Sequence, residues 1–246
     1  MVHQKQFVED ADAINFMDPI DMHRQSRKGA SIEVANQLRE TAGIQLDFPS
    51  WLPAAAKAYH ISPNLSDYIM VPVVSIPAGL PNRNGVAFPL AELLAWSVDH
   101  GCQAYRTFNG KPVFIEHQNS DPTTAIGVIV DTSLRPMQGF GEGKIWKLVK
   151  LLAIDRNKGI EVADDIVRGD LNTYSMGAYV GRYSCSVCES DLGNCSHVDR
   201  RRMRDFYVTH NGVLAFRNVH DIVGFETSSV RTPAFLSAAS DTIIHF

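Results

Sequence analysis

Between residues 68 and 230 the chain consists mainly of short apolar, β-branched runs separated by glycine, proline and asparagine residues. Runs of this length and composition are typical of β-strands, and the residues between them are typical of turns. The Asn-Gly pair at residues 211–212 favours a tight hairpin turn within 207–216. Many short strands with few helices predict a mainly β, barrel-like core. Strands are expected over residues 68–74, 112–116, 125–132, 145–154, 174–183 and 222–230.

Two segments of the same region have helical periodicity instead. Apolar residues recur at helical spacing over 89–100 and again over 159–168, where Gly169 supplies a stop signal. The expected fold class is therefore α+β, mainly β, with helices that cover the faces or ends of a small barrel.

The first 65 residues have a different character. They are polar, with a helical run expected from Ser31 to about Gly43, and the prolines within 49–63 are typical of a linker. This predicts an N-terminal leader over residues 1–65, partly helical and a candidate for proteolytic removal. A single folded domain is then expected over residues 66–246.

Charge and hydropathy exclude several classes of protein. The net charge of −4 argues against a dedicated polyanion binder, and the one basic run, at 200–204, is short enough to be a solvated face. No stretch approaches the ~20 apolar residues that span a bilayer, and the first residues lack the apolar core of a signal peptide. These features favour a reducing cytoplasm, where a disulfide framework is not expected.

Three of the four cysteines lie within eleven residues. Cys185 and Cys188 form a C-x-x-C pair, and Cys195 and His197 follow closely. Three thiolates and one imidazole are a tetrahedral ligand set of the kind that Zn²⁺ occupies in closed structural sites. A metal-free reduced loop is the alternative. We expect a structural zinc ion that stabilises an inserted loop over 184–205, with Cys102 outside the cluster.

Two residues have the chemistry of a nucleophile and its base. His117 ends a strand-like segment and is followed by a polar loop. The ordinary pKa of a histidine lies near the working pH, so the residue is suited to act as a base. Ser175 precedes Gly177 by two positions. The glycine allows close backbone approach, and its amide is a candidate oxyanion donor. Taken singly, each residue has an ordinary structural interpretation, a surface histidine or a serine within a strand.

Three motifs in order change this interpretation. The segment Pro112-Val113-Phe114-Ile115-Glu116-His117, followed by Ala125-Ile126-Gly127-Val128-Ile129, resembles the "P-V-x-x-x-H … x-x-G-x-I/V" motif of tailed-bacteriophage prohead proteases. Tyr174-Ser175-Met176-Gly177-Ala178 is similar to their serine strand. Glu226-Thr227-Ser228-Ser229-Val230-Arg231-Thr232-Pro233-Ala234 resembles their closing "E-x-S-x-V-x-x-P-A" element. The resemblance spans residues 68 to 238.

The resemblance implies a fold related to the herpesvirus assemblins and a serine-protease mechanism. It makes Ser175 the nucleophile, His117 its base, and a third polar group the partner of the imidazole. Glu226 is the residue we expect in that third role, since a carboxylate suits an imidazolium. His220 and Asp221 remain alternatives, because assemblins use a second histidine. Glu116 is a weaker alternative, since strand alternation turns it away from His117.

The resemblance also implies partners and a location. Proteases of this family act inside the phage procapsid, in the host cytoplasm, on scaffold and major capsid proteins and on themselves. Self-association is a further expectation, whereas membrane and nucleic-acid partners are not expected. Glu33 and Glu40 in the leader are candidate self-cleavage sites, since related enzymes cut after glutamate. The alternatives are a catalytically inactive capsid or scaffold component with the same fold, and a zinc knuckle that contacts nucleic acid.

Overall fold

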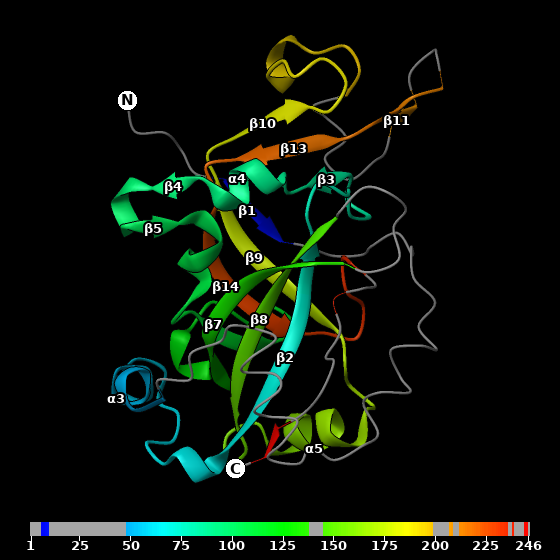
Figure 1. Cartoon of the computed structure of the whole chain (residues 1–246). Helices are drawn as coiled ribbons and strands as arrows, with labels where there is room; N and C mark the ends of the chain where they lie inside the picture. Colours follow the sequence, from blue (N-terminus) through cyan, green and yellow to red (C-terminus); the bar gives the residue numbers. More distant parts are fainter. Residues whose placement is uncertain are drawn as a thin grey trace.

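The computed structural model describes residues 6–9, 48–137, 145–198, 207–208, 212–235, 238 and 244–245. Its main feature is one sheet of eight strands that curls into a half-barrel (Figure 1). The strand order is β1-β9-β14-β6-β7-β8-β2-β15. The strands are β1 (Gln6–Glu9), β2 (Tyr68–Pro77), β6 (Pro112–Ile115), β7 (Gly127–Pro136), β8 (Trp146–Asp155), β9 (Tyr174–Val180), β14 (Val223–Ser229) and β15 (Ile244–His245).

All neighbouring pairs in this sheet are antiparallel except β14 and β6, which run parallel. The longest pairings join β8 to β2 and β7, and each contains a register shift of one residue, between Val74 and Ile76 on β2 and between Ile129 and Asp131 on β7. Such bulges increase strand twist and help a sheet to curl.

Three smaller sheets accompany the half-barrel. A three-stranded sheet of β10 (Arg182–Cys185), β13 (Arg217–His220) and β3 (Val86–Ala87) lies at the end that carries the cysteine loop (Figure 1). The expected hairpin is confirmed as β11 (Tyr207–Val208) paired with β12 (Leu214–Ala215). A short hairpin joins β4 (Trp96–Ser97) to β5 (Cys102–Gln103).

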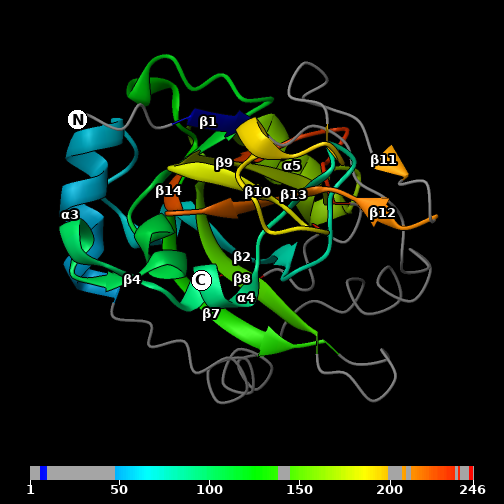
Figure 2. The same cartoon turned by 90° about the horizontal axis from the view of Figure 1, so that it is seen from above.

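The helices are short and lie outside the sheet. Those described are α3 (Phe48–Tyr59), α4 (Leu90–Leu94) and α5 (Ile160–Arg168), with 3-10 turns η1 (Leu65–Asp67), η2 (Val98–His100), η3 (Ala104–Phe108), η4 (Pro122–Thr124) and η5 (Leu192–Asn194). Helix α5 ends at Gly169, whose φ of +80° is the left-handed conformation that closes a helix at low cost. Helices α3 and α5 lie well apart from each other in both views (Figures 1 and 2).

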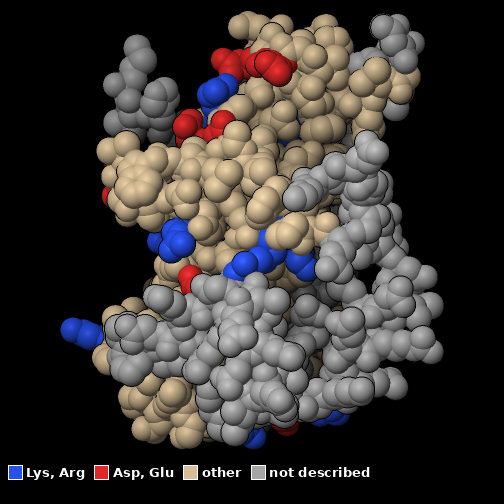
Figure 3. Space-filling view, viewed as in Figure 1, with Lys and Arg blue, Asp and Glu red and all other residues tan. Residues whose placement is uncertain are grey.

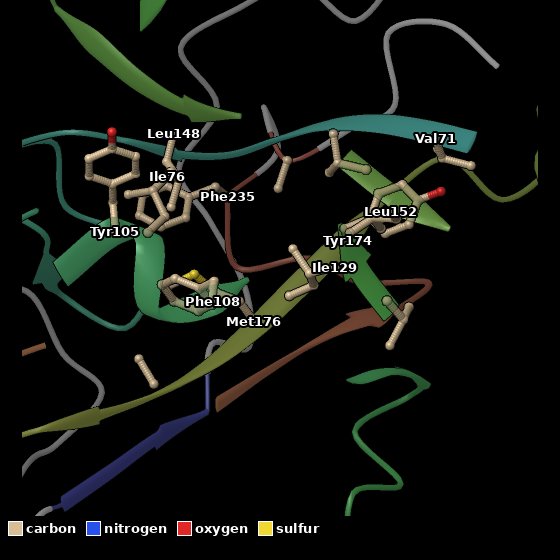
Figure 4. Close-up of a cluster of buried hydrophobic side chains, with 14 of the residues drawn as sticks. Val71, Ile76, Tyr105, Phe108, Ile129, Leu148, Leu152, Tyr174, Met176 and Phe235 are labelled. Atoms are coloured by element: carbon tan, nitrogen blue, oxygen red, sulfur yellow. The ribbon is translucent and has the colours of Figure 1, made fainter. Parts of the chain in front are cut away.

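Alternating side chains of the strands supply two hydrophobic clusters, one on each face. The larger fills the inside of the curl, where Phe108 of η3 and Met176 of β9 meet residues of β2, β7 and β8 (Figure 4). The smaller lies between the other face and α3, and Leu52 and Ala55 of the helix pack there. Strand β2 contributes Ile69 to the first cluster and Met70 to the second, so it is buried on both faces.

The expected strands are confirmed except the one over 174–183, and two other expectations are wrong. The segment 49–63 is not a linker, because α3 spans most of it and packs on the sheet with Pro53 inside the helix. The helix expected over 89–100 ends at Leu94, because the chain turns there into the β4–β5 hairpin, which leaves Val98 83% exposed. The strand over 174–183 is divided at Gly181 into β9 and β10, which belong to different sheets.

The structure is thus α+β and mainly strands, as expected, with a curled half-barrel sheet. The helical run expected from Ser31 to Gly43 lies outside the described residues. Among the helices that the structure describes, none has the length and apolar character required to cross a membrane.

Candidate active site and metal centre

The strand order places the expected nucleophile and base close together in the sheet. Ser175 is the second residue of β9, and β9 pairs with β14, which in turn pairs with β6. Ser175 lies directly opposite Ser228 of β14, and Ser229 lies opposite Ile115, the last residue of β6. His117 follows two residues after Ile115. Ser175 and His117 are therefore separated by one intervening strand at the same end of the sheet.

His117 is held by a buried carboxylate. Its Nδ1 lies 3.0 Å from Glu226 Oε1, and the Glu226 side chain is fully buried whereas that of His117 is 17% exposed. The hydroxyl of Ser228 donates to Glu226 Oε2 at 2.6 Å and accepts the backbone N–H of His117 at 3.3 Å. Ser228 thus fixes both the carboxylate and the chain segment that carries the imidazole.

Glu226, Ser228 and Ser175 share one face of the sheet, which we call the outer face. Ser228 and Ser175 are a cross-strand pair, and Glu226 precedes Ser228 by two residues. Cross-strand partners have their Cβ atoms about 5 Å apart on the same face. The intervening residues Met176 and Thr227 point to the inside of the curl. The serine and the histidine–glutamate pair therefore lie on a common surface, with Ser175 itself only 5% exposed.

A left-handed turn directs the imidazole back over the sheet. Glu116 and His117 have φ values of +45° and +56°, a conformation that costs a non-glycine residue about 1–2 kcal/mol. The turn is stabilised by the Glu116 N–H, which donates to the Ser229 carbonyl at 3.0 Å, and by Glu116 Oε1, which accepts from the Arg231 N–H at 2.9 Å. These bonds hold a strained segment whose effect is to place His117 against Glu226.

This arrangement has the elements of nucleophilic catalysis. With Nδ1–H donated to Glu226, a neutral His117 carries its lone pair on Nε2, the nitrogen at which a serine proton is accepted. A buried carboxylate stabilises the imidazolium that results. The predicted pairing of Glu226 with His117 is present in the structure.

The other candidates for the third catalytic role form hydrogen bonds elsewhere. His220 Nδ1 lies 2.8 Å from Glu92 Oε1, and His220 Nε2 lies 2.7 Å from the Ser184 hydroxyl. The Asp221 N–H donates to Glu92 Oε2 at 3.3 Å. Glu116 accepts from Arg231, as described above. Glu92 was not expected to interact with His220, since 128 residues separate them and nothing local in the sequence links them.

The Ser184–His220–Glu92 group is thus a second serine–histidine–carboxylate set. Ser184 is 3% exposed and belongs to β10, immediately before Cys185. Glu92 also lines a pocket of about 290 Å³ beside the β4–β5 hairpin, together with Trp96 and residues at the start of β14. Sequence reasoning identified neither the set nor the pocket.

The expected metal ligands come together at the end of β10. Ligand atoms of Cys185, Cys188, Cys195 and His197 all lie within 4.8 Å of one another. Backbone N–H groups donate to the Cys185 sulfur at 3.4 Å and to the Cys195 sulfur at 3.2 Å. Four N and S donors at such separations fit a tetrahedral ion, and the set is able to bind one.

The electrostatics of the cluster differ from cysteine to cysteine. A backbone hydrogen bond from Ser190, together with hydrogen bonds from His197 and the Ser190 side chain, lowers the pKa of Cys188 to about 6. Burial raises the pKa of Cys185. Cys102 lies apart, on β5.

Comparisons of the chain with protein-family models, with curated proteins and with solved structures gave no significant match. The function therefore has to be argued from the site itself.

Proposed function

We propose that this chain is a serine endopeptidase of the prohead-protease type, with Ser175 as nucleophile, His117 as base and Glu226 as the group that orients the base. The observation that carries the proposal is the 3.0 Å contact between His117 Nδ1 and a fully buried carboxylate, on the strand next to that of Ser175. The ordered motifs around these three residues support it, and so does the strained turn that aims the imidazole.

In the proposed reaction, His117 Nε2 takes the proton of the Ser175 hydroxyl as the serine oxygen bonds to a peptide carbonyl carbon. His117 then gives this proton to the departing amine as the C–N bond breaks, which leaves an acyl ester on Ser175. Water attacks the ester, His117 accepts a proton from it, and the proton returns to the serine oxygen as the acid leaves. Glu226 stabilises the imidazolium at each stage.

The metal ion belongs to the proposal in a structural role. All four donors are protein groups, so a bound Zn²⁺ would have no open position for chemistry. It would hold the loop between β10 and β13, whose own core consists of few residues. Purified protein should contain one zinc per chain. Cys188→Ser should lose that metal, and Cys102→Ser should retain it.

The proposed substrates are scaffold and major capsid proteins, cut within the assembling phage shell. Cleavage after Glu33 or Glu40 of the chain itself is part of the same proposal, and both residues lie outside the described part of the structure. On the face shown in Figure 3, basic and acidic side chains form small separate groups. The basic run at 200–204, on which the nucleic-acid alternative depends, lies outside the described residues.

The second serine–histidine–carboxylate set allows a sharp test. A fluorophosphonate probe should label the full chain once, at Ser175, as mapped by peptide mass spectrometry. Ser175→Ala should abolish both labelling and cleavage of the capsid proteins, whereas Ser184→Ala should retain both. Labelling at Ser184, or cleavage that persists in Ser175→Ala, would overturn the assignment. An unlabelled chain with no cleavage would favour an inactive capsid component.

A further inference from the structure

The outer face continues along β9 beyond Ser175. Gly177 and Tyr179 follow Ser175 on that face at two-residue intervals, and Gly177 has no side chain to obstruct it. The Tyr179 ring meets Phe225 of β14 edge to face, with centroids 5.1 Å apart. Both residues are partly exposed. An aromatic pair thus lies four residues along the strand from Ser175, within reach of an extended peptide.

The edge of β9 already carries a strand. Residues 6–9 form β1, which pairs antiparallel with β9 beyond Ser175 (Figures 1 and 2). Phe7 lies opposite Tyr179 and Glu9 opposite Gly177, so β1 runs toward the end of β9 that holds Ser175. This edge therefore accepts an added strand, and the structure shows the direction and register in which it does so.

We propose that the edge of β9 is the substrate-binding strand of the enzyme, and that residues 6–9 occupy it as an intramolecular competitor. An extended peptide adds antiparallel to β9, with its N-to-C direction toward Ser175. A large apolar residue of the peptide lies opposite Tyr179 and contacts the Tyr179–Phe225 pair. The proposal rests on the proposed function, whose substrate recognition it specifies.

The physical basis is that of strand addition. Backbone hydrogen bonds to a sheet edge supply affinity that is independent of sequence, and every second side chain of the peptide then faces the outer surface. In an antiparallel register, the residue opposite Tyr179 precedes the residue opposite Ser175 by four positions. The substrate class is therefore an extended segment with a large apolar side chain four positions before the residue that faces the nucleophile.

Displacement of β1 is the first test. In an antiparallel ladder, every second residue donates its N–H to the neighbouring strand. The double variant Phe7→Pro with Val8→Pro therefore removes one N–H that bonds to β9, whichever of the two residues donates it. This double variant should lower KM for an internally quenched capsid-derived peptide by at least about fivefold, because the local competitor is gone. Val2→Pro with His3→Pro, outside β1, is the matched control. An unchanged KM in the β1 variant would overturn intramolecular competition.

Binding of a free peptide is the second test, and it does not require catalysis. A fluorescent peptide with the sequence of residues 1–12 is titrated by anisotropy into the full chain that carries Ser175→Ala and the two prolines. Replacing phenylalanine with alanine in the peptide should weaken binding by about tenfold, since the peptide loses an aromatic contact and the apolar area buried with it. Tyr179→Ala should weaken it similarly, and Tyr179→Phe should not.

The two proposals fail in different ways. If the fluorophosphonate does not label Ser175 but the peptide binds with the stated dependence on Tyr179, the proposed activity fails and the strand-addition site stands. If Ser175 is labelled but the two peptides bind equally, the enzyme assignment stands and the proposed binding strand is wrong. The alanine peptide leaves the protein untouched, so loss of folding in a Tyr179 variant does not affect this result.

Discussion

Glu226→Gln is the substitution that most directly tests the geometry of the site. The carboxylate accepts two hydrogen bonds, from His117 Nδ1 at 3.0 Å and from the Ser228 hydroxyl at 2.6 Å, and it is fully buried. Glutamine has the same shape but presents one oxygen and one NH₂ group. Its oxygen must face one of the two partners and its NH₂ the other.

Ser228 determines which orientation the amide takes. A hydroxyl has two acceptor lone pairs, and Ser228 uses one for the His117 N–H at 3.3 Å, so it is able to accept the amide NH₂ as well. The amide oxygen then continues to accept Nδ1–H, and the imidazole keeps its tautomer. What is lost is the difference between a charge-assisted and a neutral hydrogen bond, about 1.5 kcal/mol. This corresponds to about a tenfold decrease in kcat/KM.

The assay is cleavage of an internally quenched peptide by the wild-type and Glu226→Gln proteins at a pH on the plateau of the wild-type profile, with circular dichroism to confirm folding. A decrease of less than twofold would refute a catalytic role for Glu226. A decrease near 10⁴-fold, as expected when the imidazole is held in the wrong tautomer, would show that the NH₂ faces His117 and would refute the role assigned to Ser228.

Three further predictions concern the supporting structure. Thr227→Val should lower the free energy of unfolding in urea by about 2 kcal/mol, because the buried ammonium of Lys150 loses an oxygen that accepts its hydrogen bond at 2.8 Å; Thr227→Ser, which keeps the oxygen, should cost less than half as much. Gly127→Ala should lower the free energy of unfolding by about 3 kcal/mol, because its Cβ would lie 2.1 Å from a carbonyl oxygen of β8. Gly101→Ala should lower it by only about 1 kcal/mol, since Gly101 has open space around it and only its φ of +62° is unfavourable for alanine. Equal losses in the two variants would contradict the packing argument. In metal-free protein, alkylation of Cys188 by iodoacetamide should rise with pH and reach its half-maximal rate near pH 6, because the thiolate is the reactive form and its pKa is lowered; Zn²⁺ should block the reaction, and a midpoint near pH 9 would argue against the hydrogen bonds described.

The strands could be predicted from the sequence because their pattern is local. A buried strand such as β2 is a run of apolar, mostly β-branched residues, and the turn residues on either side limit its length. Helix α4 shows where a local pattern is insufficient. The periodic residues continue to Val98, but the chain leaves the helix at Ala95, with ψ of 143°, because β4 pairs with β5 around Gly101. Periodicity over 89–100 contains no information about that pairing.

Helix α3 illustrates the opposite error. Several prolines within 49–63 are typical of a linker, yet α3 includes Pro53. Leu52 and Ala55 bury apolar surface against the outer side of β2, β7 and β8, and this packing outweighs the unfavourable helix propensity of proline. The sheet surface that the helix covers is assembled from segments distant in sequence, so the stabilisation is not visible within the helix itself.

The residues of the two sites differ in how directly the sequence identifies them. The cysteine cluster is local, and four ligands within thirteen residues required no knowledge of the fold. Glu226 was expected only because a motif resembled that of a family, since 109 residues separate it from His117. Ser228 was not assigned a role. A serine two residues after an acid on a strand faces the same side as the acid, and this spacing is the signal that could have identified it.

The parallel pairing of β14 with β6 explains why these distant residues meet. Because the two strands run the same way, the end of β6 that leads into His117 lies beside the end of β14, with Ile115 opposite Ser229. Strand β9 is antiparallel to β14, so its beginning, with Ser175, lies at that same end. Had β6 paired antiparallel with β14, the histidine would follow the strand at the opposite end of the sheet from the serine. Even in the parallel arrangement Glu226 lies three residues inside β14, and an extended chain after Ile115 would carry His117 beyond it. The two left-handed residues reverse that course and return the imidazole to the carboxylate, which gives the strained backbone at Glu116 and His117 a role in the proposed chemistry.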